Sequence, residues 1–388
     1  MQELGQTILL FDGGMGSELV KAGFSNVCPE DLNVTEPLAI TRIHESYQDA
    51  DFITTNTFGL NRLKYKGEYK ISKVVECAIQ NARKTGKKVF FDIGPTGKLL
   101  KPLGTLDFDE AYEAFREVVL LSRDFVDGYI LETFSDLYEL KSALLAVKEN
   151  SDKPVFCTMT FDKNGRTLTG TTPEIMVAFL EEMGVDALGV NCSLGPNELY
   201  NVVTRILNST HTPVILQPNR GLPRLKDGQP YYDLTVEEFS EGMQRYTQLG
   251  VSILGGCCGT TPECIHAISQ CQGKAVFPLD NPKKPYIASY SRLVELSETT
   301  VFFALSLTED ITEDACEDIA YDVLDMVDEG VEVIELQGDD IEVDILRTFV
   351  NKIQEFSNVP LRLKSNDERL QECFHRYYNG TAKSSFLR

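Results

Sequence analysis

The run VSILGGCCGT at residues 251–260 decides the fold, because it is the last of eight similar runs along the chain. Each run is short, rich in strand-forming residues and ends in Gly, Asn, Thr or Cys. Amphipathic stretches separate the runs, a pattern that indicates repeated βα units and a parallel sheet. The other seven runs are ILLFDGG from Ile8, DFITTNTFG from Asp51, VFFDIGPTG from Val89, GYILETF from Gly128, VFCTMTF from Val155, ALGVNCS from Ala187 and VILQPNRG from Val214.

Eight βα units of about 30 residues each fit the usual size of a (β/α)8 TIM barrel better than that of a doubly wound open sheet. The stretches EPLAITRIHESYQDA from Glu36 and DEAYEAFREVVLLSRDF from Asp109 carry apolar residues at helical spacing and predict two outer helices. The helix after the eighth strand is predicted to begin near Thr261, with Pro262 in its first turn. The sequence therefore predicts an α/β barrel over its first part.

The segment DNPKKP at residues 280–285 combines two prolines with charge and predicts a linker. We expect a barrel over residues 1–279, a linker over 280–298 and a short, incomplete α/β extension over 299–388. In the extension we expect strands from Val301, Val331 and Val359, helices from about Thr312 and to about Phe356, and a last apolar run near Ser385. Because these few βα units cannot close a second barrel, the extension must pack against the first barrel, dimerise or bind another polypeptide.

The 388 residues include 59 acidic and 37 basic side chains, giving a formal net charge of -22 at pH 7. A field of this sign repels phosphate backbones and anionic lipid headgroups, so we expect neither a nucleic-acid partner nor a membrane partner. No stretch approaches the ~20 apolar residues of a membrane span, and no basic segment with an apolar run opens the sequence. A cytoplasmic location is expected, where ten cysteines indicate free thiols or metal ligands rather than disulfides.

Three cysteines lie where predicted strands end: Cys192 ends the sixth strand, and Cys257 and Cys258 end the eighth. The carboxyl ends of all barrel strands gather at one rim, so these thiols can meet although 65 residues separate them. Three thiolates suit Zn²⁺, and a catalytic zinc keeps a fourth position in which a substrate thiol would be held as a thiolate. The cysteine pattern therefore predicts alkyl transfer to sulfur.

Two alternatives remain open for this triplet of cysteines. Free cysteine is among the most buried residue types, so the three thiols can also be read as small apolar core residues. A disulfide between the neighbouring residues 257 and 258 is the other alternative. For the remaining cysteines we expect only a core role; they are Cys28, Cys77, Cys157, Cys264, Cys271, Cys316 and Cys373.

Several strings over about residues 1–275 carry a family resemblance. They are FDGGMGSEL from Phe11, TTNTFGLNRLK from Thr54, DIGPTGKLLKPLG from Asp92, ETFSDLYELKSAL from Glu132, LTGTTPE from Leu168, GVNCSLGP from Gly189 and GGCCGTTPE from Gly255. The chain resembles the homocysteine S-methyltransferase family and, within it, the homocysteine domain of cobalamin-dependent methionine synthases. The resemblance implies that homocysteine is the methyl acceptor, methionine the product and zinc the activating metal.

The resemblance also assigns the substrate contacts. It implies that Asp12 and Glu132 bind the substrate ammonium and that N–H groups around Gly13 and Gly14 receive its carboxylate. An amino-acid zwitterion needs an acidic contact at one end and donors at the other, which such a division supplies. The alternative for Asp12 is a turn residue before the two glycines. The alternative for Glu132 is a salt bridge at the rim of the barrel. Asn219 matches the residue that fills the fourth zinc position before substrate arrives, with capping of its loop as the alternative.

The extension resembles the start of the pterin-binding barrel of methionine synthases, through DEGVEVIEL from Asp328, SNVPLRLKS from Ser357 and RYYNGTAKSS from Arg376. It departs from that barrel at Phe303-Ala304-Leu305-Ser306-Leu307 and at Glu335-Leu336-Gln337, which argues against folate binding by this chain. The sequence also shows no recognisable cobalamin module. We therefore expect methylcobalamin to be supplied in trans by a separate corrinoid protein.

Two other functions are considered. An onium donor such as S-methylmethionine or betaine would need an aromatic cage, for which Phe58 and Phe134 are the candidates in a chain without tryptophan. A non-catalytic zinc-binding scaffold that presents the acidic extension to a partner is the second. The extension is also a candidate surface for a homo-oligomer.

Overall fold

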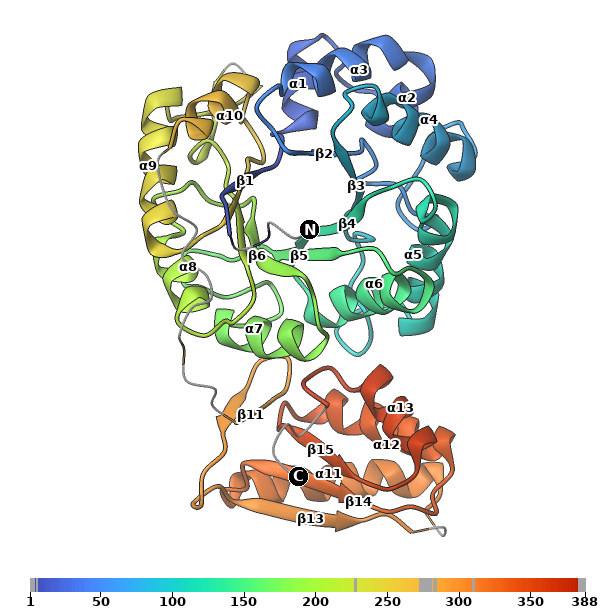
Figure 1. The fold of residues 1–388 in the computed structure, drawn as a ribbon. Helices are drawn as coiled ribbons and strands as arrows, with labels where there is room; N and C mark the ends of the chain where they lie inside the picture. Colours follow the sequence, from blue (N-terminus) through green and yellow to red (C-terminus); the bar gives the residue numbers. More distant parts are fainter. Residues whose placement is uncertain are drawn as a thin grey trace.

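The computed structural model describes residues 4, 6–226, 229–271, 281, 285–308 and 311–382. Its eight-stranded parallel sheet has the order β1-β10-β7-β6-β5-β4-β3-β2, and a parallel bridge between Phe11 and Phe52 joins β1 to β2 and closes the ring (Figure 1). The predicted barrel and all eight predicted strands are confirmed. The strands are β1 (Leu9–Leu10), β2 (Phe52–Thr54), β3 (Lys88–Ile93), β4 (Gly128–Phe134), β5 (Val155–Met159), β6 (Ala187–Asn191), β7 (Val214–Gln217) and β10 (Ile253–Leu254).

Helices surround this ring of strands on the outside (Figure 1). Several begin at a side chain that accepts a hydrogen bond from the first turn, such as Asp107 before α5 and Thr235 before α9. The predicted helices α3, α5 and α10 are confirmed, the last with Pro262 in its first turn. The outer helices are α1 (Met15–Lys21), α2 (Leu32–Thr35), α3 (Pro37–Ser46), α4 (Ile71–Arg83), α5 (Phe108–Ser122), α6 (Leu137–Asn150), α7 (Pro173–Glu182), α8 (Tyr200–Leu207), α9 (Val236–Leu249) and α10 (Pro262–Ser269), with a 3-10 turn at Pro29–Asp31.

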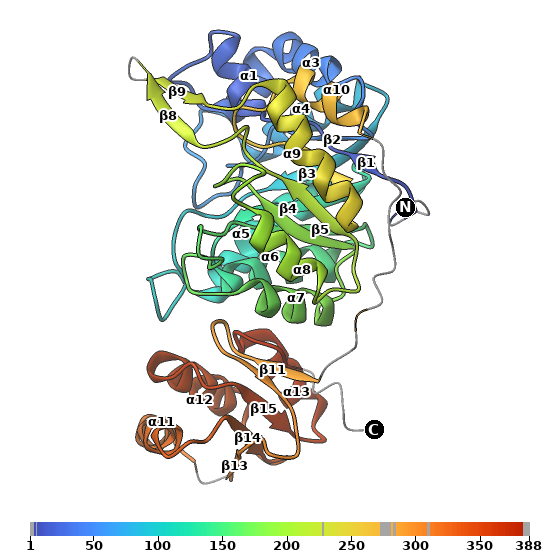
Figure 2. The ribbon, with the colours of Figure 1, turned by 90° about the vertical axis from the view of Figure 1, so that its left-hand side faces the viewer.

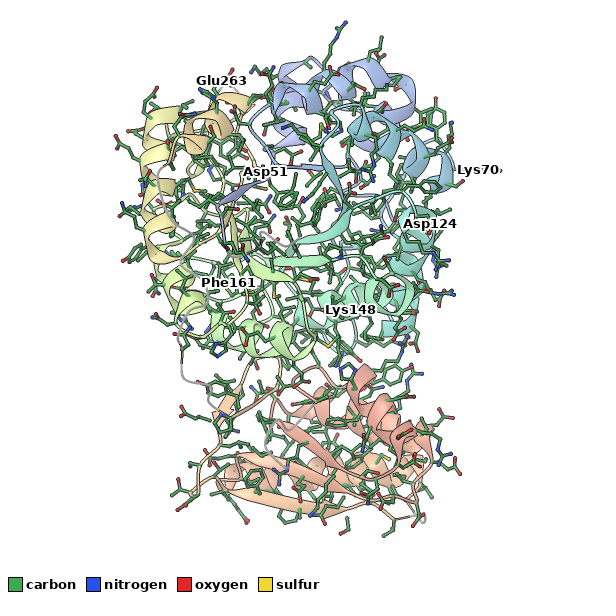
Figure 3. All side chains as sticks on the ribbon, viewed as in Figure 1. Asp51, Lys70, Asp124, Lys148, Phe161 and Glu263 are labelled. Atoms are coloured by element: carbon green, nitrogen blue, oxygen red, sulfur yellow. The ribbon has the colours of Figure 1, made fainter. Side chains whose placement is uncertain are left out.

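The inside of the barrel is filled by side chains rather than open (Figure 3). Because side chains alternate along a strand, one residue in two faces inward. The inward faces first form an apolar cluster of Leu9, Phe11, Phe52, Phe90, Ile130, Phe156, Ala187, Ile215 and Ile253. Further along the strands the same faces carry Thr54, Asp92, Glu132, Thr158, Asn191 and Gln217. A polar layer therefore covers the apolar cluster at the carboxyl ends of the strands.

A hairpin that the sequence did not predict follows the seventh barrel strand. Its strands are β8 (Pro223–Lys226) and β9 (Gln229–Tyr232), which pair antiparallel. The hairpin projects from one end of the barrel (Figure 2). The sequence between the strands is Asp227-Gly228, a dipeptide that favours tight hairpin turns and is the signal that was missed.

The extension is a three-stranded parallel sheet with three helices. It consists of β13 (Phe302–Ser306), α11 (Glu313–Asp328), β14 (Val333–Gln337), α12 (Val343–Phe356), β15 (Leu361–Lys364) and α13 (Glu368–Tyr377). Within the expected linker, residues 280 and 282–284 lie outside the described residues, as does the expected apolar run near Ser385. A hairpin of β11 (Tyr286–Ala288) and β12 (Leu293–Glu295) lies in the same interval.

The extension packs against the helices of the barrel. This is one of the three arrangements expected from the sequence, the others being dimerisation and association with another polypeptide. The Tyr138 hydroxyl of α6 donates to the carbonyl of Tyr377 at 2.9 Å, and the buried Lys141 ammonium donates to the carbonyl of Tyr378 at 2.6 Å. Arg347 of α12 pairs with Asp109 of α5 at 2.9 Å. These contacts join the extension to the outer surface of the barrel, away from the carboxyl ends of the strands.

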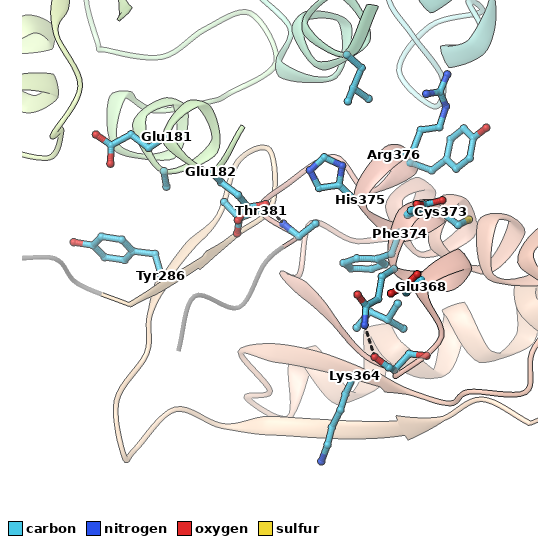
Figure 4. Close-up of a pocket in the computed structure, with 18 of the residues that line it drawn as sticks. Glu181, Glu182, Tyr286, Lys364, Glu368, Cys373, Phe374, His375, Arg376 and Thr381 are labelled. Atoms are coloured by element: carbon cyan, nitrogen blue, oxygen red, sulfur yellow. Dashed lines mark hydrogen bonds between the residues drawn. The ribbon is translucent and has the colours of Figure 1, made fainter. Parts of the chain in front are cut away.

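A cleft of about 2500 Å³ separates the two parts beside this contact (Figure 4). Its walls include Glu181 and Glu182 of α7 on the barrel side, and Lys364 and His375 on the extension side. The cleft therefore lies outside the polar layer of the barrel. Among the described residues, no helix has the length and apolar character to cross a membrane.

Candidate active site

Three cysteine sulfurs converge at the carboxyl end of the barrel. Sγ of Cys258 is 4.0 Å from Sγ of Cys192 and 4.0 Å from Sγ of Cys257, and all three sulfurs lie within 4.8 Å of one another. With a Zn–S bond of about 2.3 Å, two sulfurs on one tetrahedral ion are about 3.8 Å apart. The spacing and the soft donor set therefore fit a zinc ion.

The backbone around the cysteines is held by the neighbouring strand. The N–H of Cys192 donates to the carbonyl of Gln217 at 3.0 Å, and the N–H of Cys257 donates to the carbonyl of Pro218 at 2.9 Å. Cys192 itself has a φ of 60°, in the left-handed region that non-glycine residues seldom adopt. The thiol of Cys192 is thus presented by a strained turn at the end of β6 that its surroundings maintain.

The glycines before the cysteine pair serve close packing. A Cβ at Gly256 would lie 2.4 Å from the hydroxyl of Thr260, and a Cβ at Gly255 would lie 2.9 Å from the Cβ of Phe11. Neither glycine has a φ in the left-handed region. The close packing before the cysteine pair therefore depends on the missing side chains rather than on a special φ.

Contacts within the cysteine cluster shift the pKa values of its thiols in opposite directions. Hydrogen bonds with Cys192 and Cys257 lower the pKa of the Cys258 thiol, while the contacts with its two neighbours raise the pKa of Cys257 well above its usual range. A hydrogen bond from Tyr232 of the β8–β9 hairpin also lowers the pKa of Cys258. Tyr232 was missed by the sequence analysis, since its contact depends on where the hairpin lies in space.

Asn219 and the Gly13-Gly14 turn both contact the cysteine loop. The Asn219 side-chain oxygen accepts a hydrogen bond from the Cys258 N–H at 3.1 Å, which is the contact that loop capping requires. The N–H of Gly14 donates to the hydroxyl of Thr260 at 3.0 Å. A Cβ at Gly14 would lie 2.5 Å from the carbonyl oxygen of Cys257, so this close approach requires glycine.

The two predicted substrate acids are held in the polar layer. Asp12 is buried and accepts hydrogen bonds from the N–H and the hydroxyl of Thr54, at 3.0 and 2.9 Å. Glu132 accepts a hydrogen bond from the Asn191 amide at 2.6 Å. Burial raises the pKa of both carboxyls to about 7. Among the described residues neither carboxyl forms an ion pair, and an ammonium group would provide a compensating charge.

Asn191 connects the acid Glu132 to the strand that carries Cys192. Its fully buried amide donates to Glu132 and to the Thr133 hydroxyl, and accepts from the Thr133 N–H and the Thr158 hydroxyl. Thr133 has a φ of 63°, so these bonds stabilise an uncommon backbone conformation beside Glu132. Neither this role nor that of Asp92, a buried carboxyl of the same layer, was expected from the sequence.

We predict that Asp12→Asn stabilises the metal-free protein at alkaline pH. The folded protein binds the Asp12 proton more tightly than the unfolded chain does, so stability is lost as pH rises from about 4 through about 7. The variant's advantage in free energy of unfolding should therefore grow by on the order of 3 kcal/mol between pH 5 and pH 8. Urea denaturation at the two pH values measures it.

The exposed Asp124, which follows α5, provides the matched control for this prediction (Figure 3). Asp124→Asn should leave the difference from wild type nearly the same at both pH values, because this carboxyl is exposed to water in the folded protein as it is in the unfolded chain. A constant difference for Asp12→Asn as well would contradict the prediction.

The fold and the site together define a (β/α)8-barrel protein with a cluster of three cysteine thiols beside the acids of its polar layer. Residues 9–272 match the family described as homocysteine S-methyltransferase, and the chain belongs to that family. The resemblance recognised in the sequence is thereby confirmed.

Two methionine synthases are related to the chain. That of Mycobacterium tuberculosis is 30% identical over 329 residues, and that of Mycobacterium leprae is 30% identical over 337 residues. Each alignment covers 78% of this chain and 27% of the relative, so the chain spans only about a quarter of the length of these proteins.

The solved structures of the homocysteine methyltransferase MmuM from Escherichia coli share the fold. The metallated form aligns with a TM-score of 0.57 at 20% identity, covering 68% of this chain and 96% of that one. The apo form aligns with a TM-score of 0.54 at 22% identity, covering 69% and 97%.

Proposed function

We propose that this chain transfers a methyl group to the thiol of homocysteine and so forms methionine. The observation that carries the proposal is the convergence of three sulfurs within 4.8 Å at the barrel end where the buried Asp12 and the partly buried Glu132 also lie. Cys192, Cys257 and Cys258 would hold Zn²⁺. When bound there, zinc would keep a substrate thiol ionised at neutral pH and hence nucleophilic.

The polar layer supports an amino-acid thiol as the substrate. Asp12 is a buried acid and Glu132 a partly buried one, and an ammonium group would balance the charge of each. Gly13 and Gly14 lie beside Asp12, and a backbone N–H of this turn would receive the substrate carboxylate. The N–H of Gly14 already donates to the Thr260 hydroxyl, so that of Gly13 is the candidate. The contact of Asn219 with the Cys258 N–H supports a loop-holding role over one in the fourth zinc position.

We propose methylcobalamin on a separate corrinoid protein as the donor. Phe134 is fully buried, and the Lys64 ammonium already lies 4.3 Å from the centre of the Phe58 ring. Phe134 is therefore closed to a cationic methyl donor, and one face of Phe58 is already occupied by a cation. Tyr232 adds a single ring beside Cys258, and one ring is not a cage. These positions favour the corrinoid over an onium donor.

A donor panel tests this function directly. Zinc-loaded protein and homocysteine are combined with methylcobalamin, S-methylmethionine, betaine or methyltetrahydrofolate, and methionine is quantified, with Cys258→Ala as the inactive control. Methionine formed from methylcobalamin supports the proposal. Methionine formed only from an onium compound would show that the donor is an onium compound and not methylcobalamin. No methionine from any donor, with zinc ligation unchanged by homocysteine, would identify a non-catalytic scaffold.

A further inference from the structure

A third carboxyl of the polar layer, that of the buried Asp92, lies next to Glu132. Strand β3 pairs with β4 in parallel, with Asp92 opposite Ile130, so Glu132 lies two residues further along on the same inward face. Asp92 is 5% exposed, and its side chain is hydrogen-bonded to that of Glu132. The two carboxyl groups are therefore in contact inside the barrel.

Asp92 differs from the other two acids in its hydrogen-bond partners. Asp12 receives two hydrogen bonds from Thr54, and Glu132 receives one from Asn191. The hydroxyls of two threonines bind the backbone of Asp92 instead of its carboxyl. Its Oδ1 atom has no hydrogen-bond partner among the described residues. A buried carboxyl without donors is costly to ionise.

Most of the charge around Asp92 also opposes its ionisation. Glu132 on β4 and Asp12 after β1 oppose it, while Lys64 in the segment after β2 favours it. Burial and the Glu132 charge raise the pKa of Asp92 well above its usual range, and Lys64 is the smallest of these influences. Two carboxyls in contact cannot both be charged, so the pair keeps one proton. Asp92, which has fewer donors, is the group that keeps it.

We propose that Asp92 is a positioning residue whose protonated carboxyl donates a hydrogen bond to Glu132, so that the pair presents one oriented negative charge to the ammonium of an amino-acid thiol. Glu132 is then held on one side by the Asn191 amide and on the other by Asp92. This inference rests on the proposed function and adds a basis for selectivity. The site discriminates amino-acid thiols from thiols of the same length that lack the amino group.

Two substitutions separate donation by Asp92 from a charge on Asp92. Asp92→Asn keeps a hydrogen-bond donor towards Glu132 and can never be ionised, whereas Asp92→Ala removes the donor. Dissociation constants for homocysteine and for 4-mercaptobutanoate, its analogue without the amino group, are measured by calorimetry on the zinc-loaded full chain. Asp51→Asn, at the opposite end of the barrel strands, is the control for loss of one acid.

We expect Asp92→Asn to bind homocysteine within about threefold of wild type and Asp92→Ala to bind it at least about tenfold more weakly. Affinity for 4-mercaptobutanoate should be the same in all three proteins. Equal weakening of homocysteine binding in the Asn variant would overturn the proposal, because Asp92 would then act as a charged ligand. Unchanged binding in the Ala variant would also overturn it. If the Ala variant does not fold, the Asn variant alone decides.

The calorimetry needs no methyl donor, so the two proposals can fail separately. A wild-type protein that binds homocysteine but forms no methionine from any donor refutes the proposed function, and the Asp92 comparison still stands. A wild-type protein that methylates homocysteine while the Asp92 variants behave alike refutes only the role of Asp92. A zinc-loaded wild type that binds no homocysteine overturns both.

Discussion

Cys258→Ala is expected to lose stoichiometric zinc and to reduce kcat/KM for methyl transfer by on the order of 1000-fold, since a metal centre contributes several kcal/mol. Cys258 lies 4.0 Å from each of the other two sulfurs, so its removal breaks both of the short sulfur contacts of the cluster. Two thiolates and water would hold zinc far less tightly than three thiolates do. Any zinc that remained would have less sulfur around it to keep a bound thiol nucleophilic.

Zinc content and the number of sulfur neighbours around zinc, from X-ray absorption, measure this effect. Wild type should show three sulfurs without substrate and four with homocysteine, while the variant should show little bound metal. Cys77→Ala, which changes a partly exposed cysteine of α4, should keep both zinc and activity. A Cys258→Ala protein with one equivalent of zinc and unchanged kcat/KM would rule out the three-sulfur site.

The barrel was predictable because its strands are buried on both faces and read as short apolar runs with clear ends. The run from Val251 shows how little paired strand is needed, since β10 is only Ile253–Leu254 and still occupies its place in the ring. The β8–β9 hairpin lacked such a run and contains Pro223 and Pro230, which weaken a strand assignment. Only the Asp-Gly dipeptide indicated it.

The approach of Cys192 to the cysteine pair followed from the barrel, because all strand ends meet at one rim. Its left-handed φ did not follow, since nothing distinguishes a cysteine that adopts this conformation from one that does not. Asp92 had a usable signal: it lies two residues after the inward-facing Phe90 and therefore faces inward itself. The role of Asn191 depends on four contacts across three strands, which no local pattern reports.

Glu132→Gln should reduce kcat/KM for homocysteine by about 100-fold, mainly through KM, because a hydrogen bond to a charged group in a buried site contributes about 3 kcal/mol. The amide oxygen of glutamine can still accept from Asn191, so the substitution removes the charge and leaves that contact. Zinc content should not change, since Glu132 is not one of the three sulfurs. Glu263→Gln, an exposed acid in the first turn of α10, should leave KM unchanged.

The pH dependence of kcat/KM gives a second, independent readout for Glu132. Burial raises the pKa of Asp12 and of Glu132 to about 7 in the free protein, and both must be ionised to receive an ammonium group. Below pH 7, kcat/KM should therefore fall with the loss of two charges, and log kcat/KM should approach a slope of about two. In Glu132→Gln only Asp12 still titrates, so the slope should drop to about one. A variant that kept the wild-type slope would place the second ionisation, and with it the ammonium contact, on a residue other than Glu132.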